Sequence, residues 1–162
     1  MNWSVKSEKG FGGMTGRRII QILIATVVLT SCGNPSPFIK LNDGKCSNEQ
    51  RGQIANHISG QIKALAAGNF KGAYKYAADS FQQNVDLQQF SLIISNQYQM
   101  LISYQDYTFG DCVVEQETLV QDVDVVSKDG NFTLTYQLSF EDNKLGVLGA
   151  IIKSKLYLHD NP

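Results

Sequence analysis

The sequence predicts an α+β domain, with three N-terminal helices packed on a curved antiparallel sheet of about four strands. The first observation is a change of period: apolar residues recur every three or four positions up to about residue 101, and every second position from about residue 104. The second is the order, because helices followed by a run of strands are typical of α+β domains. The 162 residues, with 43% hydrophobic and 18% charged residues, fit one globular domain with additional segments.

The first helix is predicted to begin at Ser47, because Ser47 and Gln50 have the spacing of a capping box. Gly68 and Asn69 mark its end and the start of the next helix. Its apolar residues fall on one helical face, which we expect to be buried. These residues are Ile54, Ile58, Ile62, Leu65 and Ala66.

Two further helices are predicted over residues 70–81 and 86–101. Apolar residues in both segments step by three and four, which is the spacing of an amphipathic helix. Asp86 and Gln89 repeat the cap-like spacing at the start of the third helix. The two stripes are Phe70, Ala73, Tyr74, Ala77, Ala78 and Phe81, and then Phe90, Ile93, Ile94, Tyr98 and Leu101.

The second half of the chain predicts an antiparallel meander. Residues 104–126 are rich in β-branched and aromatic residues, and Asp129-Gly130 is a hairpin turn signal. Residues 132–140 alternate apolar and polar side chains, which predicts a strand with one buried face. A last long strand follows over residues 145–158, where Gly146 and Gly149 are expected to mark a bulge or bend.

The N-terminal segment predicts export. Arg17 and Arg18 precede eleven largely apolar residues, Ile19 to Leu29, which are too few to span a bilayer but fit a secretory signal peptide. The stretch Leu29-Thr30-Ser31-Cys32 resembles the lipobox of bacterial lipoproteins. That resemblance implies cleavage between Ser31 and Cys32 and lipidation of Cys32. The alternatives are a cleaved signal peptide without a lipid and a buried N-terminal helix in which the cysteine occurs by chance.

The chain therefore divides into three predicted parts. Residues 1–31 form the signal peptide, for which Met14 is an alternative start, residues 32–46 the lipidated cysteine and a tether, and residues 47–160 the domain. Cys46 and Cys112 would be exported with the domain, where a disulfide can persist. Such a bridge would contribute roughly 4 kcal/mol in the chain-entropy model. Two separate buried thiols are the alternative.

The stretch "QIKALAAGNFKGAYKYAADSFQQNVDLQQFSLIISNQYQML" resembles the opening of a bacterial family, domain of unknown function 4864. The resemblance extends over about residues 50–152, and the family is similar to the nuclear transport factor 2-like superfamily. That resemblance implies a cone-like α+β fold whose sheet wraps a cavity. The closing strand departs from the family pattern, because Leu145, Val147 and Gly149 stand where a tryptophan, Ile and Gly are usual. The matching residues are Ala73, Tyr74, Ala77, Ser80, Phe90, Tyr98, Phe109 and Gly110.

No catalytic signature is present in the sequence: it lacks GxSxG, a P-loop, HExxH and metal-ligand spacings of His and Cys. We therefore expect no catalytic residue, metal or cofactor. The superfamily resemblance implies a cavity, and Asp79 or Asp106 could supply a carboxylate in an isomerase-like alternative. His57 and His159 are far apart in sequence. The candidate pocket residues are Tyr74, Tyr98, Tyr104 and Tyr136.

The charge pattern argues against a nucleic-acid partner. The formal net charge is -1, and the chain after residue 31 is more acidic, because the signal segment is basic. The acidic residues of the predicted strands are interpreted as part of a sheet face that is exposed to solvent. These residues are Asp111, Glu115, Glu117, Asp122 and Asp124. The sequence thus favours a non-catalytic envelope lipoprotein that binds a small apolar molecule or another envelope protein. It would be anchored to the outer face of the cell membrane or to the outer membrane. An isomerase or dehydratase and a structural homodimer are the alternatives.

Overall fold

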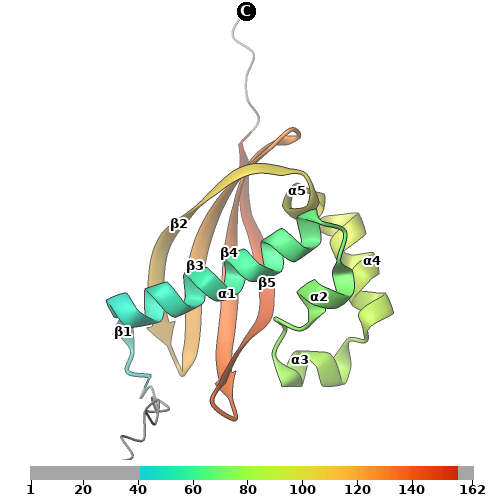
Figure 1. The fold of residues 1–162 in the computed structure, drawn as a ribbon. Coiled ribbons are helices and arrows are strands. Elements are labelled where there is room, and N and C mark those ends of the chain that lie inside the picture. The colour runs from blue at the N-terminus through green and yellow to red at the C-terminus, as the bar shows by residue number, and fades with distance from the viewer. Residues whose placement is uncertain (1–40, 157–162) are drawn as a thin grey trace, which may run out of the picture. The chain divides into compact units, whose positions relative to one another are not determined.

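The computed structural model describes residues 41–156, and the predicted signal peptide, Ser31–Cys32 cleavage site and most of the tether lie outside these residues. Five helices and a five-stranded antiparallel sheet make up the described part (Figure 1). The helices are α1 (Asn48–Ala66), α2 (Phe70–Tyr74), α3 (Asp79–Asn84), α4 (Leu87–Gln97) and α5 (Gln99–Ile102). The strands are β1 (Gly44–Lys45), β2 (Tyr104–Glu115), β3 (Thr118–Ser127), β4 (Gly130–Glu141) and β5 (Lys144–Leu156).

The sheet is a meander in the order β1-β2-β3-β4-β5, in which every neighbouring pair is antiparallel. Two tight turns, Gln116–Glu117 and Asp142–Asn143, have positive φ at both central residues, which matches the right-handed twist of the strands that they join. The helices cover one face of the sheet, and α1 runs across the strands (Figure 1). Alternate residues of β3 and β4 are consequently buried beneath the helices.

Helix α1 supplies the largest share of the helical core. The capping box at its start is formed: the Gln50 backbone N–H donates to Ser47 Oγ, and the Ser47 N–H donates to Gln50 Oε1. The buried stripe follows the apolar spacing, and it meets the inward side chains of β3 and β4 in one hydrophobic core. The fully buried members of the stripe are Ile54, Ile58, Ile62 and Leu65.

The prediction of three helices on about four strands is wrong, because the domain has five helices and five strands. The segment predicted as one helix over 70–81 divides into α2 and α3. Between them the backbone pairs with β5: Val147 N–H donates to the Tyr76 carbonyl (2.8 Å) and Ala78 N–H donates to the Val147 carbonyl (2.9 Å). Gly146 permits this approach, since a Cβ there would overlap the Cα of Ala78.

The other differences have local causes. The segment predicted as a third helix divides at Tyr98, whose backbone (φ −123°, ψ 35°) leaves the helical region between α4 and α5. The fifth strand is β1, which pairs with Val113 and Val114 of β2. Two residues are too short to produce an alternating pattern, so this strand gave no period-two signal in the sequence.

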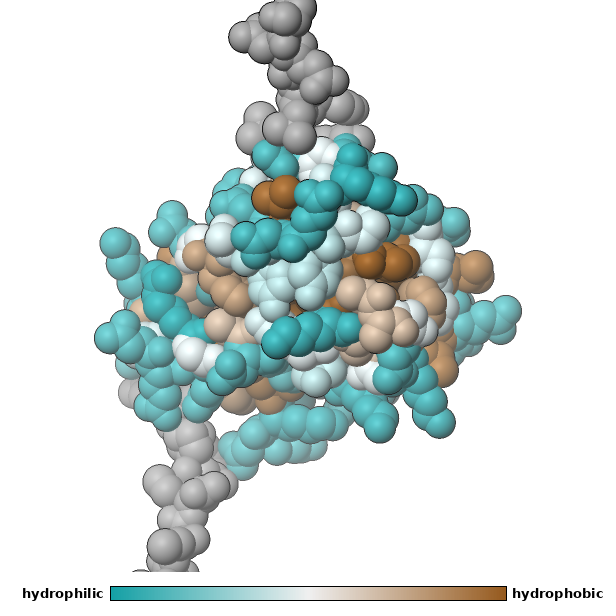
Figure 2. Space-filling model, turned by 45° about the horizontal axis from the view of Figure 1, so that its top comes forward, coloured by the Kyte–Doolittle hydropathy of each residue, from teal (hydrophilic) through white to brown (hydrophobic). Residues whose placement is uncertain are grey.

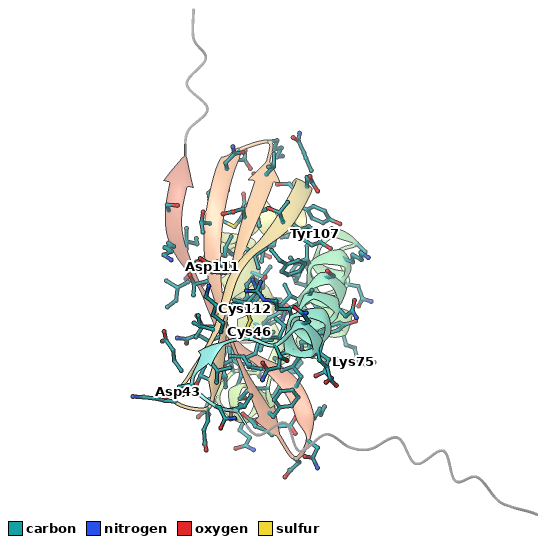
Figure 3. All side chains as sticks on the ribbon, turned by 90° about the vertical axis from the view of Figure 1, so that its left-hand side faces the viewer. Asp43, Cys46, Lys75, Tyr107, Asp111 and Cys112 are labelled. Carbon is teal, nitrogen blue, oxygen red and sulfur yellow. A yellow bond between two sulfur atoms is a disulfide. The ribbon has the colours of Figure 1, made fainter. Side chains whose placement is uncertain are left out.

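Cys46 and Cys112 form a disulfide, with their Cα atoms 5.4 Å apart (Figure 3). The Cys46 N–H also donates to the Cys112 carbonyl (3.1 Å). Both residues are buried. The bridge thus fixes the start of α1 to β2 and continues the contact that β1 makes with the same strand.

Strand β2 is bulged at Gly110 and Asp111, and a buried glutamine of β3 stabilises the bulge. Gln121 is 1% exposed. Its Nε2 group carries two hydrogens, which are shared among the carbonyls of Gly110 (3.2 Å), Asp111 (3.1 Å) and Asp122 (2.7 Å). The side chain therefore satisfies carbonyl groups that the bulge removes from the regular ladder.

Candidate functional site

A small apolar cavity lies between α4 and the strands β4 and β5, with contributions from α1, α3 and α5. Its volume is about 130 Å³. Small-molecule sites are usually apolar cavities with a few polar groups, so this is the best candidate site of the described domain. The lining residues are Gln61, Ala77, Phe81, Phe90, Ile93, Ile94, Tyr98, Leu101, Tyr136, Val147, Gly149 and Ala150.

Helix α4 forms one wall of the cavity through residues spaced by three and four. Phe90, Ile93 and Ile94 all line it. The helix is fixed at its start by a second capping box, in which the Gln89 N–H donates to Asp86 Oδ1 and the Asp86 N–H donates to Gln89 Oε1. The same amphipathic stripe that makes the helix pack against the domain therefore makes the cavity apolar.

Helix α3 brings Phe81 to the cavity, and a carboxylate of β4 holds the start of this helix. Glu141 accepts hydrogen bonds from the hydroxyl (2.6 Å) and the backbone N–H (2.8 Å) of Ser80. The Ser80 hydroxyl first, and then its N–H, lower the pKa of Glu141. Asp79 of the same helix pairs with Lys144 at the surface (3.1 Å).

Tyr136 lines the cavity, and its hydroxyl is buried within the wall. Tyr136 lies on the inner face of β4 between Gln121 of β3 and Ala150 of β5, and is 1% exposed. Its hydroxyl is buried and has no hydrogen-bond partner among residues 41–156. Burial raises the pKa of Tyr136, and the nearby Tyr98 and Tyr107 raise it further, so the phenol stays protonated.

Two other polar side chains reach the cavity. Tyr98, at the end of α4, donates its hydroxyl to the carbonyl of Ala150 on β5, and burial raises its pKa. Gln61 of α1 is 4% exposed and also lines the cavity. The Tyr98 hydrogen is thus engaged, whereas the Tyr136 hydroxyl has no acceptor among residues 41–156.

The cavity belongs to a domain with a recognised sequence family. A family model described as Domain of unknown function (DUF4864) matches residues 47–156. The chain belongs to the DUF4864 family. A comparison with curated proteins finds no match. All the residues that line the cavity fall inside the DUF4864 match, and the relationship to the nuclear transport factor 2-like superfamily stays a prediction.

The four tyrosines named from the sequence have different surroundings in the DUF4864 domain. Tyr98 and Tyr136 line the cavity. Tyr74 lies behind its wall, with its ring 5.4 Å from that of Phe90 and its hydroxyl donated to the Val85 carbonyl (2.6 Å). Tyr104 packs on the β2 residue Tyr107 and is not among the lining residues.

Gln61 and Tyr107 were missed by sequence reasoning. Gln61 follows Ile58 by three positions and precedes Leu65 by four, so a polar residue on the buried stripe of the first helix was the available signal. Tyr107 lies in a strand with register shifts, and the inward side of such a strand cannot be read from alternation. Figure 3 labels Tyr107 on β2.

Acid–base groups lie elsewhere in the described domain. Asp106 is exposed and accepts the N–H of Tyr107 (2.9 Å). His57 Nε2 lies 2.8 Å from the Tyr76 carbonyl, and burial lowers the pKa of His57 more than this hydrogen bond raises it. Among the lining residues there is no Asp, Glu, His, Lys or Arg. Residues 41–156 also contain no group of three or more His, Cys, Asp or Glu side chains that could hold a metal ion.

The acids of the outer sheet face have local partners or face solvent. Asp122 accepts a hydrogen bond from Thr135 (2.6 Å) and pairs with Lys153 (3.2 Å), and Asp124 accepts from Thr133 (2.7 Å). A second hollow, of about 650 Å³ and mainly polar, lies near the β2–β3 turn. It lacks the apolar walls of the first cavity and is the weaker candidate. Asp111, Glu115 and Glu117 are exposed.

The described surface is mainly hydrophilic, and Figure 2 shows hydrophobic side chains as separate groups on one face. Val126 and Ile151 pair with different residues of β4, so the register does not join them into one stripe. Scattered exposed hydrophobic residues are normal and do not favour the homodimer alternative. No helix within residues 41–156 is long and apolar enough to cross a membrane. The large exposed hydrophobic residues are Leu92, Val126, Ile151 and Ile152.

Proposed function

We propose that this chain is an exported, lipid-anchored binding protein whose DUF4864 domain holds a small molecule in the cavity between α4, β4 and β5. The observation that carries the proposal is the cavity itself, which has a volume of about 130 Å³ and a wall that is apolar apart from Gln61, Tyr98 and Tyr136. An apolar molecule that enters such a cavity gains free energy in proportion to the apolar area that it buries.

Binding is favoured over catalysis by the chemistry of the wall. A general base must lie within hydrogen-bond reach of the proton that it removes. The cavity is lined by apolar residues, two tyrosines and Gln61, and a protonated phenol is not a base. Asp79 and Asp106, which would have to serve an isomerase, are not among the lining residues.

The lipid anchor is supported by the sequence alone. Arg17 and Arg18, the apolar stretch and the Ser31-Cys32 pair occur in the order of a lipoprotein signal. Metabolic labelling with an alkyne analogue of palmitate tests it. We expect label on the wild-type chain and none on Cys32→Ala. An unlabelled wild type, or label that persists in Cys32→Ala, would contradict the anchor.

Native mass spectrometry of the protein, extracted gently from its own membranes, tests the binding function. We expect a reproducible added mass on the folded wild-type chain. Ala150→Leu is the matched control, because it enlarges a side chain of the cavity wall without changing charge. The added mass should be lost in this variant while its circular dichroism stays native. An adduct that is equally abundant in folded Ala150→Leu would place the ligand outside the cavity.

A further inference from the structure

We infer that the ligand of this cavity is a single-chain amphiphile, whose hydrocarbon chain enters between α4 and β5 and whose uncharged polar head stays outside the opening. This assignment rests on the proposed binding function and names the chemical class of the ligand. It follows from the place where the cavity opens, from the apolar residues that continue its wall, and from the charges around the opening.

The cavity opens between the helices α3 and α4 on one side and the strand β5 on the other. It is partly open to solvent, and its lining residues differ in exposure. The lining residues of α1, β4 and α5 are buried, whereas the partly exposed ones lie on α3, on β5, and in or directly after α4. A ligand can therefore extend out of the cavity on this side. The partly exposed lining residues are Phe81, Ile93, Tyr98, Gly149 and Ala150.

The buried part of the wall favours a hydrocarbon chain. Apart from Gln61 and Tyr136, its residues are apolar, and no lining residue carries a charge. A methylene group that leaves water for such a wall gains free energy, whereas a polar head placed there would lose its hydration. The chain of an amphiphile therefore lies inside and its head outside. The apolar buried residues are Ala77, Phe90, Ile94, Leu101 and Val147.

The apolar wall continues beyond the opening on β5. Ala150 of the wall pairs with Tyr136 of β4. Two positions further along β5, Ile152 pairs with Leu134. Both of these β4 residues are buried on the side that the helices cover, so Ile152 lies on the same face of β5 as Ala150. Ile152 is 39% exposed, and a chain that extends past Ala150 would cover it.

The residues around the opening fit an uncharged head. Residues 76–127, which include α3 and α4, contain no lysine, arginine or histidine. Asp79 of α3 already pairs with Lys144 (3.1 Å), and Lys153 of β5 pairs with Asp122 (3.2 Å). Apart from Leu92, the exposed residues of α3 and α4 carry amides, which both donate to and accept from hydroxyl groups. They are Gln83, Asn84, Gln88, Gln89, Asn96 and Gln97.

The test uses alkyl glucosides, which share one uncharged head and differ in chain length. Binding of the hexyl, octyl and decyl compounds to the purified full-length chain is measured by calorimetric titration, below the concentrations at which they form micelles. Ile152→Ser is compared with Ile151→Ser. Ile151 is 59% exposed and pairs with Thr135, so it lies on the opposite face of β5. Ala150→Leu, which enlarges a side chain of the wall, and cyclohexanone, a compact probe without a chain, complete the set.

We expect the affinity of the wild type to rise at least about fivefold from the hexyl to the octyl compound, because each buried methylene contributes up to about a fourfold gain. Ile152→Ser should weaken binding of the decyl compound at least about threefold and that of the hexyl compound by less than about twofold. Ile151→Ser should change neither by more than about twofold. Decyl sulfate and decyltrimethylammonium should bind at least about threefold more weakly than decyl glucoside, because their charged heads lose hydration without gaining an ion pair.

The outcomes separate the ligand class from the proposed function. If cyclohexanone binds the wild type but chain length has no effect, or if Ile152→Ser and Ile151→Ser act alike, the amphiphile is wrong while binding in the cavity stands. If the charged compounds bind as tightly as decyl glucoside, the uncharged head is wrong. If no probe binds the wild type, or if all bind folded Ala150→Leu as well as they bind the wild type, binding in this cavity is itself contradicted.

Discussion

Replacing Tyr136 by phenylalanine should make the protein more stable. The substitution removes one oxygen atom from a residue that is 1% exposed and keeps the ring that packs in the core. An unsatisfied buried hydroxyl costs roughly 1–3 kcal/mol in the folded state, whereas in the unfolded chain it is hydrated. We therefore expect the free energy of unfolding to rise by about 1 kcal/mol, and the midpoint of thermal unfolding by about 4 °C for a domain near 100 residues.

Urea unfolding of the ligand-free protein, followed by circular dichroism, measures this change. Tyr98→Phe is the matched control: it removes the same atom from a tyrosine of the same cavity, but one whose hydroxyl donates to Ala150. It should lower the free energy of unfolding by about 1 kcal/mol, because a carbonyl loses its donor. The two substitutions are thus expected to differ in sign.

A loss of stability in Tyr136→Phe as large as that in Tyr98→Phe would refute this reasoning. Tyr136 would then have a hydrogen-bond partner in the folded protein. An unchanged slope of the free energy against urea is required in both variants, since a changed slope indicates an altered denatured state.

Three further outcomes are expected. The double substitution of Cys46 and Cys112 by alanine should lower the free energy of unfolding, measured by urea titration, by roughly 4 kcal/mol, because the disulfide closes a long loop. A decrease under about 1 kcal/mol would contradict this. Gln121→Leu should lower the free energy of unfolding by about 1–3 kcal/mol in the same titration, because the carbonyls of the β2 bulge lose their donor. Unchanged stability would contradict the role given to Gln121. Burial lowers the pKa of His57 in the folded protein below its ordinary value of 6.5. The stability that neutral His57 provides is therefore complete above pH 6.5, and it is lost as the pH falls through the pKa of the folded state. As the pH is lowered from about 7.5 to about 5, the midpoint temperature of thermal unfolding should therefore fall more steeply in the wild type than in His57→Gln. Equal slopes of midpoint against pH would refute this assignment.

The parts of the fold that depend on local sequence could be predicted. The capping box at Ser47 is encoded within one turn of helix, and the apolar stripe of α1 within a few consecutive turns. The turn between β3 and β4 lies at Lys128–Asp129, one residue before the predicted Asp129-Gly130 signal. The division of residues 70–81 into α2 and α3 does not depend on local sequence. It depends on backbone hydrogen bonds to Val147 and on the missing side chain of Gly146, about 70 positions away along the chain. Helical periodicity carries no information about such a contact.

The residues of the candidate site could likewise be predicted only where local sequence determines them. Tyr136 could be named because it belongs to a strand with strict alternation, and Tyr98 because it continues the stripe of α4. Neither pattern predicts that one hydroxyl reaches an acceptor while the other is left free, since this depends on how β5 and α4 meet. Tyr107 and Gln61 became evident only in three dimensions, because a register shift and a polar position in an apolar stripe are weak signals.

The central claim, that this cavity takes up a small molecule, is tested most directly by methyl NMR spectra of the full-length protein during titration with cyclohexanone. We predict saturable shifts at the methyl groups of the wall, namely those of Ile94, Leu101 and Val147, with little change at Ile54 and Leu119, which are buried in the core but do not line the cavity. Shifts that are absent, or equally large at Ile54 and Leu119, would contradict it.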